Sequence, residues 1–531
     1  MLRFKKRILT VLILAAFTAS STAAERPRVV INIIAGSMQA EALEHYAHNM
    51  GQGGFARLMA RGAVFTDAHY GWMQTTTPPS LATLATGATP ATHGIVASRW
   101  YDYTQQRFTD VVADDKTKIV GAGDRRGGYS PQNMVAPTLT DMLVRSDRMS
   151  RAITIAIRPS SAIITAGSSG HCFWLDCEKC RWTTSTAYAE NLPAWVDEYN
   201  SQDMKIRFLD SEWVCSHVQE RYLNKYAAGA AVFAQQAGGK KRNTATAAAK
   251  SEKILATPAG NSIVFDFAKY ALTAMHLGAD THTDIINIYL DAPDEIAARY
   301  GCESVEYEDM LYRLDNEIKE FLNYLSVHMR YSETALVVFT SAHGTAPCPP
   351  TAAQQADRFV PRQFELIVNA YLSARYGQGQ WVLGYQDRSL YLNRSLIRDK
   401  RMSLEEVQSE VASFAMQFRG VAHAVTAAAL QSSYFADGYA AKIQRGFYPR
   451  RSGDVIINLF PERTAADDGY RSESGSMYSY DTHVPLIFYG AGTAAKRYDM
   501  PTDMTCVAPT LARIMQIAAP AAAEGRALNI E

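Results

Sequence analysis

The sequence has no excess of charge of either sign, and beyond its N-terminal region it has no long hydrophobic run. Lys and Arg together number 53 among the 531 residues, and Asp and Glu also number 53. With no net charge, the chain has no overall field that would draw it to nucleic acid, so we expect no nucleic-acid partner. No later stretch reaches the roughly 18 apolar residues of a membrane-spanning helix, so we expect no transmembrane span in the mature chain.

Cysteine is also scarce, and its number is odd. The chain has seven cysteines, so at least one thiol is left over when pairs form within a monomer. Cys177 and Cys180 have the spacing of half a zinc knuckle or of a redox pair, but no second Cys or His pair follows at finger spacing. A structural disulfide is therefore the interpretation that we favour for this pair.

The first 24 residues have the pattern of a secretory signal peptide. Four basic residues lie between Arg3 and Arg7, an apolar run covers Ile8 to Phe17, and small residues follow from Ser20 to Ala24. The apolar run is too short to cross a bilayer core of about 30 Å. We expect cleavage after the signal peptide, residues 1–24, and a periplasmic or secreted mature chain; an uncleaved N-terminal anchor is the alternative.

Short runs rich in β-branched residues predict strands that are buried on both faces of a sheet. Stretches with helical patterning, such as Ser304–His328, lie between these runs. This alternation predicts an α/β fold with a mostly parallel central sheet flanked by helices, whose site lies beyond the carboxyl ends of the strands. The runs are Val29–Ile34, Ala152–Ile157, Ile285–Leu290 and Ala335–Thr340.

One large domain, residues 25–531, is expected to carry two additions. Residues 225–253 are rich in Ala, Gly, Gln, Thr and Lys and have few large apolar side chains, which predicts a flexible insertion. Residues 351–450 contain further strand and helix patterns, and they predict an inserted cap region that folds against the main sheet.

Two stretches of the sequence carry a specific resemblance to a known family. Thr77–Ile95 reads TPPSLATLATGATPATHGI, and Arg99–Asp102 follows it as RWYD. Together they resemble the nucleophile region of the alkaline phosphatase superfamily, in its type I phosphodiesterase/nucleotide pyrophosphatase branch. The similarity to the phosphate-irrepressible, single-domain alkaline phosphatases extends through Gly446–Asp454 to Gly525–Leu528. It implies an alkaline-phosphatase-like fold and, in active members, a two-zinc site.

The resemblance implies a nucleophile at Thr77 and a reduced phosphate-binding set. On local sequence alone, a threonine-rich turn before a helix favours capping of backbone N–H groups, and only the resemblance makes a nucleophile an equal alternative. Arg158 stands where the family has a cation, and it could hold a phosphate through a forked contact. Ser98 and Ser160 stand where phosphatase members have an asparagine and a second cation.

The metal ligands that the resemblance implies are only partly present. Asp294 and His483 occupy two ligand positions of one metal, and His343 occupies one position of the other metal, beside Thr77. Catalytic zinc typically has three protein ligands, so both sites are degenerate. Replacement ligands are conceivable at Asp481, Asp291 or His45, although their spacing does not predict it. The three missing ligands are replaced by Ala35, Ala298 and Ala342.

The sequence therefore predicts an exported pseudo-hydrolase that has lost two-zinc catalysis, holds no cofactor and acts by binding. Without zinc, no nearby motif offers a base to activate Thr77. We expect a phosphorylated or sulfated ligand at Arg158, or an envelope protein partner at the cap. The alternative is an active metal-dependent phosphomonoesterase or phosphodiesterase with a remodelled zinc site and Thr77 as nucleophile. A third possibility is a structural envelope subunit with a vestigial cavity.

Overall fold

The computed structural model describes residues 26–121, 127–202, 208, 212–233, 254–328, 334–348, 358–463, 465 and 470–530. The signal peptide predicted at 1–24 lies outside the described residues, and so does the part 234–253 of the predicted insertion. The described part of that insertion lies against the start of helix α12 (Val305–His328). There, the backbone N–H groups of Ala228 and Ala230 donate to the Glu306 carboxylate at 3.0 and 3.1 Å.

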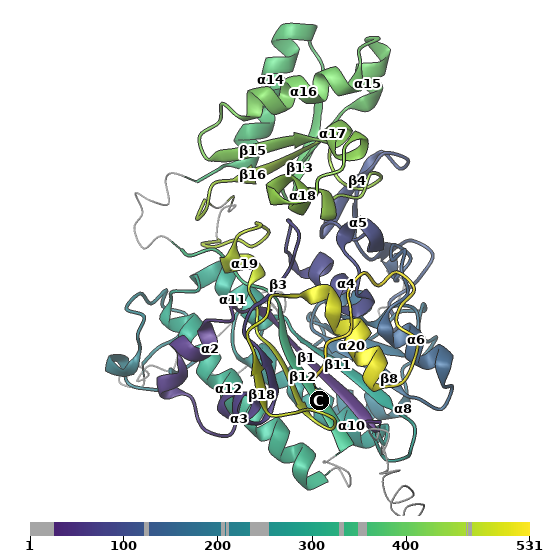
Figure 1. Cartoon of the computed structure of the whole chain (residues 1–531), viewed down its shortest axis with the longest axis vertical. Coiled ribbons are helices and arrows are strands. Elements are labelled where there is room, and N and C mark those ends of the chain that lie inside the picture. Colours follow the sequence, from purple (N-terminus) through teal and green to yellow (C-terminus); the bar gives the residue numbers. More distant parts are fainter. Residues whose placement is uncertain are drawn as a thin grey trace, which may run out of the picture.

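A nine-stranded sheet forms the centre of the molecule (Figure 1). The strands β9, β8, β11, β1 and β12 run parallel to one another, and β10 and β17 are antiparallel to their neighbours. This confirms the predicted α/β class and its mostly parallel sheet. The order is β10 (Arg181–Thr183), β9 (His171–Asp176), β8 (Ala152–Ala156), β11 (Asp284–Leu290), β1 (Val29–Ser37), β12 (Ala335–His343), β17 (Leu486–Gly490), β2 (Ala63–Phe65) and β18 (Lys496–Tyr498).

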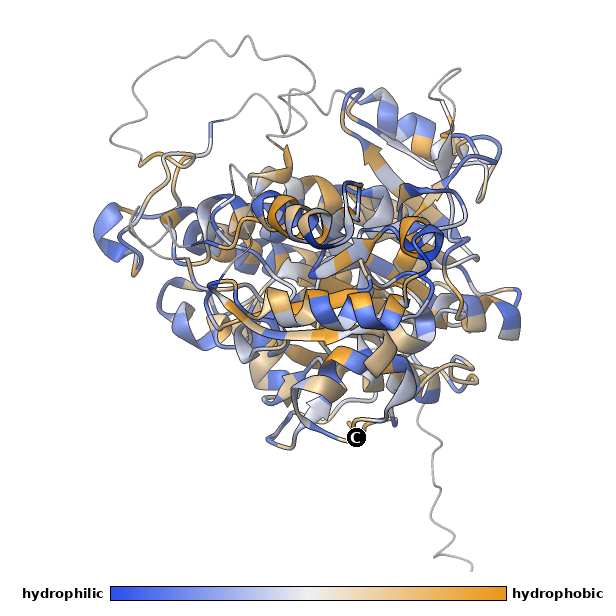
Figure 2. Ribbon diagram, turned by 90° about the horizontal axis from the view of Figure 1, so that it is seen from above, coloured by the Kyte–Doolittle hydropathy of each residue, from blue (hydrophilic) through white to orange (hydrophobic). Residues whose placement is uncertain are grey.

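The two faces of this sheet bury separate hydrophobic cores. On β1, Val29, Ile31 and Ile33 belong to one core, whereas Val30 and Ile34 belong to the other. Successive side chains of a strand point to opposite faces, so a strand covered on both sides has no polar face. Figure 2 shows hydrophobic residues gathered in the central strands and hydrophilic residues toward the outer helices and loops.

Helices cover both faces of the sheet. The helix expected over Ser304–His328 is α12, which contributes to the core of the first face. No helix of the described part of the chain combines the length and the apolar character needed to cross a membrane. The other helices of the first face are α3 (Phe55–Arg61), α8 (Ala194–Ser201), α10 (Ala259–Ala274) and α11 (Ala292–Tyr300), and those of the second face are α4 (Thr77–Thr86), α6 (Leu139–Ser146), α7 (Pro159–Ala166) and α20 (Val507–Ile514).

Shorter elements connect and border the central sheet. The two-residue strand β3 pairs with β19, and it leads from the sheet toward the start of α4. The shorter elements are α2 (Ala42–His45), β3 (Ala68–His69), α5 (Pro90–His93), β4 (Arg99–Asp102), β5 (Arg107–Asp110), β6 (Ala113–Asp114), β7 (Gly128–Tyr129), α19 (Ser479–Thr482) and β19 (Thr502–Asp503).

The cap has its own sheet and core, and it lies at one end of the molecule (Figure 1). Residues 351–357 of the predicted cap lie outside the described residues. Strand β16 lies between β14 and β15, so the cap sheet runs to Leu459, past the boundary expected near residue 450. The strand order is β13 (Val382–Gln386), β14 (Ser389–Leu392), β16 (Val455–Leu459) and β15 (Val421–Thr426), and the helices are α14 (Pro361–Tyr376), α15 (Arg394–Asp399), α16 (Leu404–Ala415), α17 (Ala427–Ser432) and α18 (Gly438–Arg445).

The disulfide expected at Cys177 and Cys180 does not form. All seven cysteines, each of which lies in the described part of the chain, are thiols. The Cys180 thiol donates a hydrogen bond to the carbonyl oxygen of Cys177, with 3.6 Å between sulfur and oxygen. Burial raises the pKa of the Cys177 thiol to about 12, which disfavours the reactive thiolate. The prediction of a structural disulfide at this pair is therefore wrong.

Candidate functional site

A pocket of about 320 Å³ lies at the carboxyl ends of β1, β11 and β12. Ser37 and His343 line it from the last residues of β1 and β12, and Asp294 lines it from the first turn of α11, just after β11. Thr77 and Arg158 line it from the starts of α4 and α7. Four of the predicted site residues therefore meet at the edge of the sheet where the fold class places functional sites.

The hydroxyl of Thr77 points into this pocket and does not cap a helix. Thr77 is the first residue of α4, after Thr76, whose side chain makes no capping hydrogen bond. The Thr77 Oγ1 donates to Asp294 Oδ2 at 2.5 Å and lies 3.0 Å from His343 Nε2. Of the two interpretations that the sequence left open, the structure favours a hydroxyl that belongs to the site.

Asp294 and His343 form a buried ion pair beside this hydroxyl. His343 Nε2 lies 3.1 Å from Asp294 Oδ1, and the Tyr289 hydroxyl donates to Asp294 Oδ2 at 3.1 Å. His343 Nδ1 lies 2.6 Å from the carbonyl oxygen of Gly344, which can only accept, so this nitrogen carries a proton. Gly36 permits the close packing, because a Cβ atom there would lie 2.9 Å from the Asp294 nitrogen.

The charges of this pair stabilise each other. Burial alone would raise the pKa of Asp294, but the charge of His343, its hydrogen bond and the charge of Arg158 lower that pKa to about 2. Burial alone would lower the pKa of His343, but the Asp294 carboxylate raises it above the ordinary value. A protonated His343 cannot accept the proton of Thr77, and a carboxylate of such low pKa is a poor base.

Arg158 already has carboxylate partners. Its Nη2 lies 2.5 Å from Glu295 Oε2, and its Nη1 lies 3.9 Å from Asp294 Oδ2. Glu295 also forms an ion pair with Arg299, one helical turn further along α11. A phosphate or sulfate group entering the pocket would therefore compete with Glu295 for the Arg158 guanidinium.

The two serines predicted to bind phosphate do not join Arg158. The backbone N–H and the hydroxyl of Ser98 donate to Asp387 Oδ2 at 3.0 and 3.2 Å. Asp387 belongs to the β13–β14 turn of the cap, so Ser98 fixes the cap to the main domain. Ser160 lies in the first turn of α7, is half-buried and is not part of the pocket lining.

His483 lies apart from Asp294, the residue with which it shares a metal in the family arrangement. Its Nδ1 lies 2.7 Å from Glu41 Oε1, and its Nε2 lies 2.8 Å from the carbonyl oxygen of Thr66. Its ring stacks on that of His69, with the ring centroids 4.5 Å apart. Both nitrogens face groups outside the pocket, so the structure does not bring these two family ligand positions together.

Comparison with known proteins places the chain in a family. The model of the family described as "Type I phosphodiesterase / nucleotide pyrophosphatase" matches residues 30–483. The chain belongs to this family. The match confirms the predicted branch of the alkaline phosphatase superfamily.

The similar proteins include alkaline phosphatases of nearly the same length. Alkaline phosphatase PafA of Elizabethkingia meningoseptica is 26% identical over 551 residues, which cover 100% of this chain and 99% of PafA. Alkaline phosphatase PhoV of Synechococcus elongatus is 25% identical over 529 residues, which cover 95% of this chain and 92% of PhoV. The crystal structure of PafA matches with a TM-score of 0.87 and 24% identity, covering 96% of this chain and 99% of that chain. The fold is therefore that of an alkaline phosphatase.

The side chains of the pocket do not fit the two-zinc centre that the family resemblance implies. Ala35 and Ala342 are fully buried in β1 and β12, and Ala298 lines the pocket; their methyl groups carry no lone pair. Asp294 and His343 bond to each other. Within the described residues, no three His, Cys, Asp or Glu side chains gather here as a metal-binding group, whereas zinc takes at least three protein ligands.

The replacement ligands considered from the sequence do not turn into the pocket. The Asp291 carboxylate accepts from the backbone N–H of Ile157 at 2.7 Å, and it caps the start of α7. The Asp481 carboxylate accepts from the backbone N–H of Ser476 at 2.7 Å. His45 is exposed on α2. None of the three is part of the pocket lining.

Four side chains in the pocket or next to it were not predicted from the sequence: Glu295, Tyr289, Arg388 and Glu473. Glu295 directly follows the predicted ligand position Asp294, so a second carboxylate there could have been noticed. Tyr289 lies inside a strand run and carries no pattern of its own. Arg388 of the cap pairs with Glu473 at 3.2 Å across 85 residues of sequence, and no local signal joins them.

Proposed function

We propose that this chain is a non-catalytic member of its family, which acts by binding and has lost two-zinc hydrolysis. The observation that carries the proposal is the direct contact among Thr77, Asp294 and His343. The hydroxyl expected to be the nucleophile donates to one retained ligand and lies beside the other. In this arrangement the two retained side chains neutralise each other.

The chemistry of the pocket supports this proposal. A threonine nucleophile needs a metal, a base or a lowered pKa to lose its proton. His343 is held in its protonated form by Asp294, so it offers Thr77 no lone pair. No described side chain of the pocket takes the place of the ligands lost at Ala35, Ala298 and Ala342.

The pocket is less suited to a phosphorylated or sulfated ligand than the sequence suggested. Arg158 is paired with Glu295, His343 with Asp294, and Arg388 with Glu473, so each of these cations meets a carboxylate. We propose that binding uses the rim between the pocket and the cap, and that the partner is a molecule or protein of the cell envelope. The signal peptide pattern at residues 1–24 supports export to that compartment.

Hydrolysis assays test the loss of catalysis. We expect the purified chain, with added Zn²⁺, to release no product from an aryl phosphate monoester or diester above the level of its Thr77→Ala variant. The physical reason is that Thr77 is not activated. Zinc-dependent turnover that disappears in Thr77→Ala would overturn the proposal and support the alternative, an active phosphoesterase with a remodelled site.

A second prediction concerns Arg158. We expect Glu295→Gln to strengthen the binding of inorganic phosphate or sulfate by about tenfold, because it removes the charge that competes for the guanidinium. Isothermal titration of each anion into the two proteins measures this change. Glu410→Gln is the matched control, since Glu410 forms a similar pair with Arg375 in the cap at 2.5 Å. Equal affinities in all three proteins would show that the anion does not reach Arg158.

A further inference from the structure

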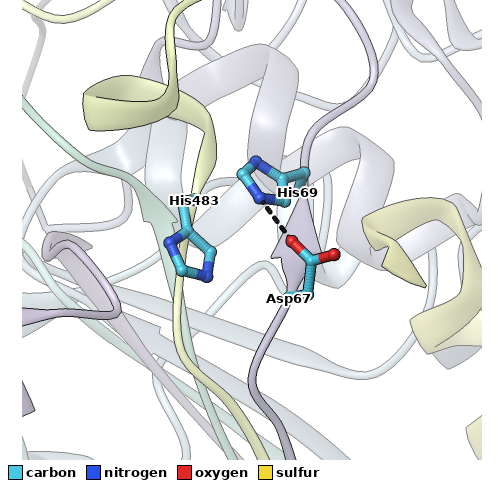
Figure 3. A group of neighbouring side chains, drawn as sticks. All are labelled: Asp67, His69 and His483. Atoms are coloured by element: carbon cyan, nitrogen blue, oxygen red, sulfur yellow. Dashed lines mark hydrogen bonds and ion pairs between the residues drawn. The ribbon is translucent and has the colours of Figure 1, made fainter. Parts of the chain in front are cut away.

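Asp67, His69 and His483 form a compact group of side chains outside the Thr77 pocket (Figure 3). We call this group the His69 cluster. One ligand atom from each residue lies within 4.8 Å of the other two, and among the described residues this is the one such group of three. The proposed loss of catalysis makes no use of these side chains.

The backbone holds the cluster in place from two distant parts of the chain. Asp67 and His69 belong to the β3 segment, and His483 follows α19. His69 and His483 form an antiparallel bridge, and Tyr70 donates its N–H to the carbonyl oxygen of Thr482 at 3.0 Å. Because the backbones are fixed, the three side chains lose little further freedom when they bind a common ion.

Each nitrogen of His69 has a distinct role. Its Nε2 lies 2.9 Å from Asp67 Oδ1, and its Nδ1 lies 3.2 Å from the Thr482 hydroxyl. Without an ion, Nε2 donates to the Asp67 carboxylate, which can only accept, and Nδ1 accepts from the Thr482 hydroxyl. When an ion binds Nε2, the proton moves to Nδ1, and Nδ1 then donates to the Thr482 oxygen. A second hydrogen bond that fixes the tautomer in this way is the usual arrangement of a metal-binding histidine.

His483 has the same kind of support. Its Nδ1 lies 2.7 Å from Glu41 Oε1, so a proton on Nδ1 can be held by that carboxylate. Its Nε2 lies 2.8 Å from the carbonyl oxygen of Thr66. In Figure 3 the rings of His69 and His483 lie next to each other, and the Asp67 carboxylate lies beside both.

The cluster is accessible from solvent. The side chains of His69 and Asp67 are 35% and 42% exposed, and that of His483 is 16% exposed. An ion can therefore enter without local unfolding, and water can complete its coordination. Two imidazoles and a carboxylate suit Zn²⁺ and similar first-row metals, whereas Ca²⁺ and Mg²⁺ prefer oxygen ligands alone.

We propose that the His69 cluster binds one divalent transition-metal ion, such as Zn²⁺, through Asp67, His69 Nε2 and His483 Nε2. The ion displaces the proton that His483 Nε2 donates to the Thr66 carbonyl oxygen, and this proton is released to solvent. Thr482 and Glu41 hold the two rings through their Nδ1 atoms. This site joins the loop after α19 to β3, so it has a structural role separate from the Thr77 pocket.

Equilibrium dialysis of the purified chain against Zn²⁺ alone tests the proposal. We expect one ion per chain, and an affinity that falls more than about 100-fold in His69→Ala and in Asp67→Asn. Thr482→Val removes only the partner of His69 Nδ1, so we expect a loss of about tenfold. His423→Ala is the matched control and should bind normally, since His423 is a partly exposed histidine stacked on Tyr439 in the cap.

Two further measurements keep the result interpretable. Co²⁺ alone should give visible absorption bands in the wild-type chain and in His343→Gln, but not in Asp67→Asn. Circular dichroism should show that each variant is folded. The proposal fails if the wild-type chain binds no zinc, or if His69→Ala and Asp67→Asn bind it normally. Zinc binding lost only in His343→Gln would place the ion in the Thr77 pocket, which contradicts this proposal and the proposed loss of the zinc centre together.

Discussion

Replacing Asp294 with alanine is expected to lower the free energy of unfolding by about 3 kcal/mol, because it leaves His343 without its buried partner. The two side chains are only 11% and 3% exposed, so water compensates little for the loss. Chemical denaturation of the wild-type chain and the variant measures the difference.

The pH dependence of this difference follows from the two pKa values. The pKa of Asp294 is lowered from 3.8 to about 2, so its contribution is present above pH 3.8 and is lost as the pH falls toward 2. The pKa of His343 is raised from 6.5, so its contribution is complete below pH 6.5 and is lost as the pH rises through the raised value. The effect of Asp294→Ala should therefore be largest between about pH 4 and pH 6.5.

A double-mutant cycle separates the pair from general disturbance of the pocket. The double variant Asp294→Ala, His343→Gln should lose clearly less free energy of unfolding than the two single variants lose together. The second change removes the charge that the first leaves unpaired. Asp280→Ala is the control. Asp280 pairs with Arg151 at 3.1 Å, but both side chains are 35% exposed, so its loss should cost less than about 1 kcal/mol. Strict additivity in the cycle would show that the ion pair contributes nothing.

Replacing Trp381 with alanine is expected to destabilise the cap by about 3–5 kcal/mol, since it opens a large cavity in a close-packed core. Trp381 is fully buried in the cap core, and its Nε1 donates to the carbonyl oxygen of Gly377 at 3.0 Å. Native-state hydrogen exchange measures the effect in each part of the molecule. Backbone amides of β14 in the cap should lose protection, whereas those of β1 should keep theirs.

An exposed aromatic residue of the cap serves as the control, because its removal opens no cavity. Tyr434 lies outside the cap core and is 87% exposed, so Tyr434→Ala should change protection by less than about 0.5 kcal/mol. Equal loss of protection in β14 and β1 after Trp381→Ala would mean that the cap and the main sheet unfold as one unit, so that the cap core is not an independent unit of stability.

Several features of the site could be predicted from the sequence because their positions follow from the fold. Thr77 begins a helix, Asp294 follows strand β11, and His343 ends strand β12. In a parallel sheet the carboxyl ends of neighbouring strands meet at one edge, so a strand pattern with a polar residue after it is enough to bring them together.

Other positions depended on loops whose paths the sequence does not specify. His483 stands three residues before the buried start of β17, but its ring turns to Glu41 and Thr66. Ser98 was expected to face phosphate, and it bonds to Asp387 because the cap turn reaches over it. In both cases the partner comes from a part of the chain hundreds of residues away.

By itself, the sequence determined the α/β class, the family and the absence of three ligands at Ala35, Ala298 and Ala342. These follow from local composition, from strand and helix periodicity, and from the identity of single residues. Only the tertiary structure decided that Asp294 and His343 pair with each other, that Glu295 occupies Arg158, and that His483 joins His69. A hydrogen bond depends on distances of about 3 Å between atoms, and only the packed molecule sets those distances between residues far apart in the chain.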